Sequence, residues 1–172
     1  MMSPKVQEAL NRQIHSEIRA SYIYLAMSAW LEASHWVGAA KWMRLQSQEE
    51  YGHAMRLFDF LLARGGAVAL GAIDAPKHDF KNIVEVFEAA FAHEKEVSKQ
   101  IDALYELAGK EKAYAALVQL EWFITEQVEE EKTIREIVAQ LNMVKDDPAS
   151  LLDIDRDLGA RGPETAAADA TA

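Results

Sequence analysis

The sequence contains no cysteine, and this absence removes several kinds of site at once. Without thiolates the chain can hold no disulfide, no zinc–thiolate site and no iron–sulfur cluster. No apolar run approaches the roughly 18 residues that span a membrane. The first residues, Met-Met-Ser-Pro-Lys, do not form the apolar core of a signal peptide. We therefore expect a cytoplasmic protein that is neither exported nor associated with a membrane.

Basic side chains are outnumbered, since 18 Lys and Arg stand against 28 Asp and Glu and leave a net charge of −10. This balance disfavours nonspecific binding to nucleic acid. It is compatible with attracting cations, although solubility alone also accounts for it. With 172 residues, half of them apolar, the chain is long enough for one domain with a sizeable core.

Helical periodicity runs through almost the whole chain, so the predicted fold class is all-α. Ser3 is placed as an N-cap with Pro4 at the first helical position, and Gly65 with Gly66 stops the second helix. Asp147 caps a short fifth helix. The predicted helices span approximately residues 4–33, 36–64, 83–108, 110–142 and 148–159.

Four long helices, two short turns and one long middle connection describe a four-helix bundle with a single crossover. The connection, residues 65–81, can run about 40 Å along the bundle if the second and third helices are parallel. We expect residues 1–158 to form the bundle domain with its short fifth helix. Residues 159–172, rich in Ala, Asp and Gly, are expected to be a mobile tail.

Each long helix places one acidic residue at mid-length, on a stripe that is otherwise apolar. The fourth helix illustrates this, because its heptad seam from 113 to 141 is apolar except at Gln127 and Glu130. In packed helices, mid-length residues meet at the same height, so these side chains should converge in one layer. The expected layer consists of Glu17, Glu50, His53, Glu94, Gln127 and Glu130.

Four carboxylates in one dry layer would repel each other at a cost of several kcal/mol each, unless cations lie between them. Two divalent ions would match their charge. Carboxylates with one histidine and no sulfur suit iron or manganese better than structural zinc, although zinc or cobalt could bind by affinity alone. Ligand positions left open for water or O₂ favour redox chemistry.

One tyrosine and a second Glu-x-x-His pair lie outside this set of candidate ligands. Tyr24 is either core packing with a bonded hydroxyl or a hydrogen-bond donor to a metal-bound carboxylate. Glu32 and His35 share the Glu-x-x-His spacing of Glu50 and His53, but they lie at the first turn, far from the mid-length layer. We interpret that second pair as surface or capping groups.

The segments around the layer resemble the ferritins over about residues 6–158. The matching segments are Glu17 with Tyr24, Glu49-Glu50-Tyr51-Gly52-His53, His93-Glu94, Glu121-Trp122-Phe123 and Glu126-Gln127-Val128-Glu129-Glu130-Glu131. Gln127 and Glu130 stand where bacterioferritins have a second Glu-x-x-His, so the chain is similar to prokaryotic non-haem ferritins. Bacterioferritins carry their haem-ligating methionine at the position of Gly52, and the resemblance therefore implies no haem.

The resemblance implies ferroxidase activity, in which O₂ or peroxide takes electrons from bound Fe²⁺ and Fe³⁺ passes to a stored mineral. It implies a first iron site of Glu17, Glu50 and His53, with Glu50 bridging to a second. The second iron site would use Glu50, Glu94 and Glu130, with Gln127 close by. A third iron site matches Glu49, Glu126 and Glu129, which otherwise form an ordinary acidic face. The short last helix, with Leu151, Leu152 and Leu158, matches the fifth helix of ferritins that assemble a 24-subunit cage.

Other classes of protein stay open. One is a di-iron enzyme acting on a separate substrate, such as a peroxidase or oxygenase, although no Cys-rich segment suggests a rubrerythrin. Another is a DNA-protecting mini-ferritin, whose iron ligands lie between subunits; the acidic chain without a basic N-terminal tail disfavours it. The last is a plain structural bundle, in which replacing the four buried Glu by Leu would raise stability without affecting function.

Overall fold

Five helices account for most of residues 2–163, the part of the chain that this computed structural model describes. Their bounds are α1 Pro4–Ala33, α2 Val37–Ala63, α3 Ile83–Lys110, α4 Tyr114–Val144 and α5 Pro148–Gly159. The all-α prediction is therefore confirmed. None of the helices in the described part of the chain is long and apolar enough to cross a membrane. Most of the expected tail, residues 164–172, lies outside the described residues.

The helix starts follow the capping residues that the sequence offers. The Ser3 hydroxyl accepts a hydrogen bond from the Val6 amide at 3.3 Å, and Asp147 accepts one from the Ala149 amide at 3.1 Å. The predicted end of the third helix at residue 108 is wrong by two residues. Gly109 lies inside α3, and the turn is made instead by Lys112, whose φ is +53°. The fourth helix likewise ends at Val144, two residues beyond its predicted end.

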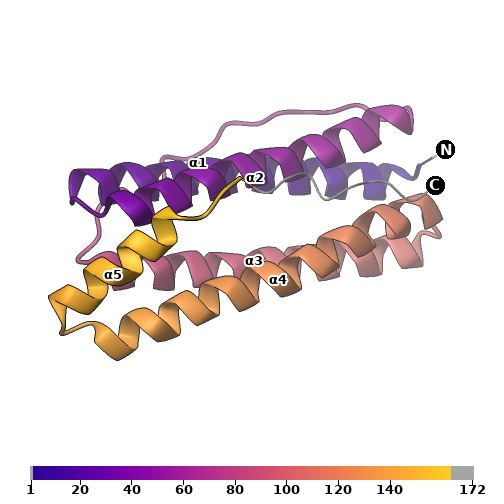
Figure 1. Cartoon of the computed structure of the whole chain (residues 1–172). Coiled ribbons are helices and arrows are strands. Elements are labelled where there is room, and N and C mark those ends of the chain that lie inside the picture. The colour runs from indigo at the N-terminus through magenta and orange to yellow at the C-terminus, as the bar shows by residue number, and fades with distance from the viewer. Residues whose placement is uncertain (1, 164–172) are drawn as a thin grey trace.

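Two antiparallel hairpins, α1–α2 and α3–α4, pack into the bundle (Figure 1). The crossover after α2 runs back along the bundle and delivers the chain to the start of α3, so α2 and α3 are parallel as predicted. The Asn11 side chain on α1 holds this crossover. Its Nδ2 donates to the Ala67 carbonyl at 2.9 Å, and its Oδ1 accepts from the Ala69 amide at 2.7 Å.

The apolar core falls into two clusters, one toward each end of the bundle. One contains, among others, Leu31, Met43, Phe87 and Leu141. The other contains, among others, Leu10, Leu57, Ile101 and Leu120. Every long helix contributes residues to both clusters, and in each helix the boundary between the two clusters falls at mid-length. A buried polar layer therefore separates the two apolar halves of the core.

Helix α5 folds back from the end of α4 onto the start of α2 (Figure 1). The N-terminus of α2 has no side-chain cap of its own. The Asp155 carboxylate on α5 supplies one, accepting from the Gly38 amide at 3.1 Å and the Ala39 amide at 2.8 Å. A Cβ on Gly38 would lie 1.7 Å from the Asp155 carbonyl oxygen, so this crossing requires glycine.

Candidate metal centre

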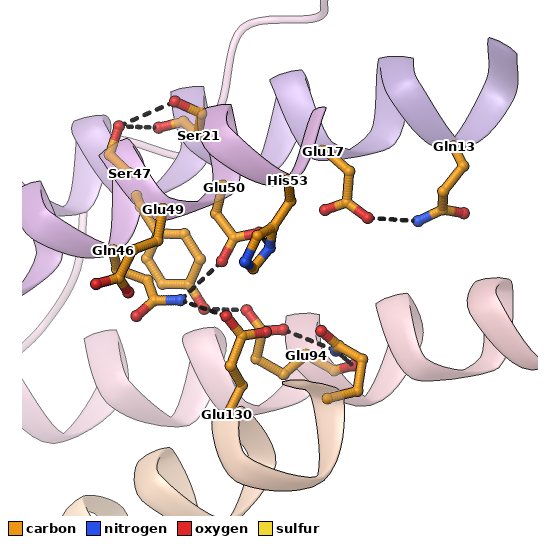
Figure 2. Close-up of polar contacts among 12 residues, drawn as sticks. Gln13, Glu17, Ser21, Gln46, Ser47, Glu49, Glu50, His53, Glu94 and Glu130 are labelled. Carbon is orange, nitrogen blue, oxygen red and sulfur yellow. Dashed lines mark hydrogen bonds and ion pairs between the residues drawn. The ribbon is translucent and has the colours of Figure 1, made fainter. Parts of the chain in front are cut away.

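Five acidic and histidine side chains from all four long helices meet in the polar layer (Figure 2). Glu17, Glu50 and His53 form one group in which single ligand atoms lie within 4.8 Å of one another. Glu50, Glu94 and Glu130 form a second group by the same criterion. Glu50 belongs to both groups, so the layer has the geometry of two adjacent ligand sets with one shared carboxylate.

Glu17 and Glu50, from the first hairpin, are each oriented by a glutamine one turn earlier on the same helix. Gln13 Nε2 donates to Glu17 Oε1 at 2.8 Å, and Gln46 Nε2 donates to Glu50 Oε1 at 2.7 Å. The other oxygen of Glu50 lies 3.4 Å from His53 Nδ1. Each glutamine occupies one carboxylate oxygen and leaves the other directed toward the shared space, as Figure 2 shows for Glu17.

Glu94 of α3 accepts hydrogen bonds from two other helices. The Tyr24 hydroxyl of α1 donates to one oxygen, and Gln127 Nε2 of α4 donates to the other at 3.1 Å. Tyr24 is fully buried, and its hydroxyl donates to Glu94 across the bundle, so it packs in the core with a bonded hydroxyl. That Glu94 is bound to a metal, as the other interpretation of Tyr24 requires, stays a prediction.

Glu130 of α4 reaches Gln46 across the bundle, with Gln46 Nε2 donating to Glu130 Oε1 at 3.0 Å. Two buried oxygens in the layer, Glu17 Oε2 and Glu130 Oε2, have no hydrogen-bond partner. A buried oxygen without a partner costs free energy and normally marks a place for a ligand, an ion or water. These two atoms lie in different ligand groups, so each group has an oxygen ready for a cation.

The electrostatics of the layer disfavour four ionised carboxylates. Burial, and after it the neighbouring carboxylates, raises the pKa of Glu50 and of Glu130 well above the usual value for Glu. Burial is also the main cause that raises the pKa of Glu17. Without a cation these shifts favour the protonated form of the glutamates, and a divalent ion that binds there competes with their protons.

Aromatic rings enclose His53 on the α4 side. Its ring lies edge-on to Trp122 at 5.3 Å and to Phe123 at 5.9 Å between ring centroids. The Arg56 guanidinium covers the Trp122 ring at 4.2 Å. This arrangement keeps the imidazole of His53 nine-tenths buried and limits the water that reaches the layer.

The three residues predicted for a third iron site do not converge as the ligands of the two groups above do. Glu49, Glu126 and Glu129 line one pocket of about 270 Å³, together with Glu130. Within residues 2–163, the groups of ligands close enough to share an ion are the two described above, and these three carboxylates do not form another. Glu49 instead pairs with Arg161, at 2.5 Å between Oε2 and Nη2. Glu32 and His35 are exposed at the α1–α2 turn, as expected.

Two residues that orient the layer were not predicted as part of the site, Gln13 and Gln46. The signal was present in the sequence, because each glutamine stands four residues before a layer glutamate, in Gln13-x-x-x-Glu17 and Gln46-x-x-x-Glu50. Residues four apart share a helix face. A glutamine on an apolar stripe, one turn from a buried glutamate, can therefore be predicted from the sequence as the hydrogen-bond partner of that glutamate.

The comparison with known proteins agrees with this geometry. Residues 7–144 match the model of the Ferritin family, described as a ferritin-like domain. The chain is 42% identical over 161 residues to a bacterial non-heme ferritin of Bacteroides fragilis, covering 94% of this chain and 100% of that one. It is 38% identical over 159 residues to a probable bacterial non-heme ferritin-like protein of Haemophilus influenzae, covering 92% and 96%. The structure of an open pore ferritin from the archaeon Archaeoglobus fulgidus superposes with a TM-score of 0.93 at 41% identity, covering 94% and 99%.

Proposed function

The chain belongs to the ferritin family, and we propose that it is a non-haem ferritin that stores iron and oxidises Fe²⁺ as it does so. Fe²⁺ is the substrate and O₂ or hydrogen peroxide the oxidant. The product, Fe³⁺, collects as a mineral inside an assembly of identical chains. The observation that carries the proposal is the pair of ligand groups sharing Glu50, because a shared carboxylate holds two ions side by side.

The first Fe²⁺ would take Glu17, Glu50 and His53 as ligands. The second would take Glu50, Glu94 and Glu130, with Gln127 close enough to orient Glu94. Two divalent ions bring four positive charges to four carboxylates, which removes the repulsion that keeps the empty layer protonated. Binding therefore releases protons from the glutamates, and the layer becomes neutral in net charge.

Each Fe²⁺ gives up one electron, so a bound pair supplies the two electrons that reduce O₂, with two protons, to hydrogen peroxide. The chain's own contribution is placement. Gln13, Gln46 and Tyr24 hold the carboxylates in a fixed geometry before any ion arrives, so little reorganisation is needed. Ligation that is incomplete on the protein side leaves room for the oxidant and lets Fe³⁺ leave.

Storage requires an enclosed space, which one bundle does not have. We propose a cage of 24 subunits in the cytoplasm, with α5 at the contacts between chains. The exposed Leu152 of α5 supports this, because it places an apolar side chain on the outside of the subunit while Leu151 and Leu158 are buried. Glu49, Glu126 and Glu129 are proposed as ligands for a third iron ion beside the pair.

A stopped-flow assay of Fe²⁺ oxidation on a size-fractionated sample, with the iron content of each particle, tests the function. The double variant Glu50→Ala/His53→Ala should lose nearly all fast oxidation while remaining assembled. The control is Glu32→Ala/His35→Asn, which removes a pair of the same spacing outside the layer. Asn is used because His35 has a φ of +66°. Unchanged kinetics in the first variant, or a monomer that retains no iron, would contradict the proposal.

A further inference from the structure

The residues that follow α5 return toward α2 (Figure 1). One of them, Arg161, contacts two side chains of α2 beside the metal centre. Arg161 Nη2 donates to Glu49 Oε2 at 2.5 Å, and its Nη1 donates to Gln46 Oε1 at 3.1 Å. Its guanidinium lies 4.5 Å above the centre of the Trp42 ring. The Arg161 and Glu49 side chains are 20% and 17% exposed, so this is a largely desolvated pair and not a loose surface contact.

The pocket that Arg161 enters adjoins the layer of ligands. Glu49, Glu126, Glu129 and Glu130 line it, and Arg161 is the one basic residue lining it in the described part of the chain. Glu130 also belongs to the second ligand group, and its buried Oε2 has no hydrogen-bond partner. An ion that leaves the centre past Glu130 therefore enters a space of four carboxylates in which a guanidinium already sits.

Gln46 connects the two sites through its amide. The oxygen of that amide accepts from Arg161, while its nitrogen donates to Glu50 and to Glu130. Arg161 thus fixes the orientation of a side chain that holds the shared ligand Glu50. The contact spans residues that are more than a hundred positions apart in sequence and joins α2 to the segment after α5.

We propose that Arg161 is an internal cation that an iron ion must displace to enter or leave the acidic pocket beside the paired site. The inference rests on the proposed function and adds a residue that sets the affinity of this pocket. A guanidinium stays charged at any physiological pH, so the competition does not depend on protonation of Arg161. A divalent ion carries twice its charge and can replace it, at the cost of the hydrogen bonds to Glu49 and Gln46.

Removing the guanidinium should therefore tighten cation binding in the pocket. Charge-assisted hydrogen bonds of this kind correspond to a change in affinity of about tenfold or more. If Arg161 only tied the segment after α5 to α2, its loss would loosen that segment and would not increase the affinity for a metal. The direction of the change in affinity separates the two roles.

The test is anaerobic calorimetric titration of the assembled, iron-free protein with Fe²⁺, so that binding is measured without oxidation. Wild type should bind two Fe²⁺ tightly per chain and further Fe²⁺ weakly. Arg161→Gln should bind an additional Fe²⁺ about tenfold or more tightly than wild type does, and adding Glu129→Gln should remove that gain. The matched control is Arg156→Gln, an exposed arginine of α5 paired with Asp153. It should behave as wild type.

Arg161→Lys keeps the charge but loses the two-pronged contact, and its affinity for the additional ion should fall between those of wild type and Arg161→Gln. If Arg161→Gln does not assemble, the affinity of Arg161→Lys for the additional ion tests whether Arg161 competes with the metal. An additional ion no tighter in Arg161→Gln or Arg161→Lys than in Arg156→Gln would overturn the role of Arg161 and leave the proposed function standing. Absence of the two tight ions in wild type would overturn the proposed function itself.

Discussion

Replacing Glu50 by Gln should stabilise the metal-free protein and destabilise the metal-loaded protein relative to wild type. Glu50 is 1% exposed, and its pKa is raised well above 4.5 by burial and by Glu94 and Glu17. An ionised carboxylate at this position is desolvated beside Glu94 and Glu17, and a buried polar group without a suitable partner typically costs about 1–3 kcal/mol. Gln has the same shape, can still accept from Gln46, and carries no such cost.

The assay is thermal unfolding at pH 7, first with a chelator and then with Zn²⁺, which has the charge of Fe²⁺ but no redox chemistry. With the chelator, Glu50→Gln should unfold about 2–12 °C above wild type, since 1 kcal/mol corresponds to roughly 2–4 °C for a domain of this size. With Zn²⁺ at a hundredfold excess over its dissociation constant, each occupied site adds about 2.7 kcal/mol to wild type. The order of the two proteins should then reverse.

The control is Glu106→Gln, which removes an exposed carboxylate on α3 that faces Lys110 at 3.4 Å. Exposed pairs contribute little, so its stability should stay within about 0.5 kcal/mol of wild type in both conditions. If Glu50→Gln instead lowers the stability of the metal-free protein, and Zn²⁺ raises both proteins equally, Glu50 is a structural polar group. Like-charge repulsion at Glu50 would then not limit the stability of the metal-free protein.

Three further predictions follow from the layer and from its supports. Burial raises the pKa of three glutamates in the layer, so their contribution to metal-free stability is full below pH 4.5 and is lost as the pH rises toward neutrality. Unfolding measured with a chelator from pH 4.5 to 7 tests this, and a stability that does not change with pH would contradict it. Tyr24→Phe leaves a buried oxygen of Glu94 without its donor and should cost about 1–3 kcal/mol by chemical denaturation, whereas no change would mean that the hydroxyl is not needed. Gly38→Ala places a Cβ 1.7 Å from the Asp155 carbonyl oxygen and should expose α5 to protease, while Gly52→Ala, with nothing within 4 Å, should leave protease resistance unchanged.

The long helices and the ligand layer were predictable because the relevant signals are local. Seam periodicity identified the buried face, and mid-length position supplied the height at which Glu17, Glu50, Glu94 and Glu130 meet. Antiparallel and parallel packing both preserve that height, so no knowledge of the helix order was needed. The predictions of the helix ends were less accurate. A turn such as that at Lys112 needs one residue with a positive φ, and several neighbouring residues could adopt that conformation.

The contact of Arg161 could not be predicted in the same way. Its position depends on how α5 crosses α2, and that crossing is fixed by Gly38 beside the backbone at Asp155. Neither residue belongs to a periodic pattern, and they are more than a hundred positions apart. Composition suggested only a tail after residue 159, because no local signal connects an arginine there to Glu49.

The most direct test of a paired metal site is the number of Fe²⁺ ions oxidised per chain in the first fast phase at saturating O₂. Two ligand groups that share Glu50 predict two Fe²⁺ per chain in wild type and a near-complete loss of that phase in Glu50→Ala/His53→Ala. One Fe²⁺ per chain, or a fast phase that survives the double variant, would contradict the assignment of the layer as a paired site.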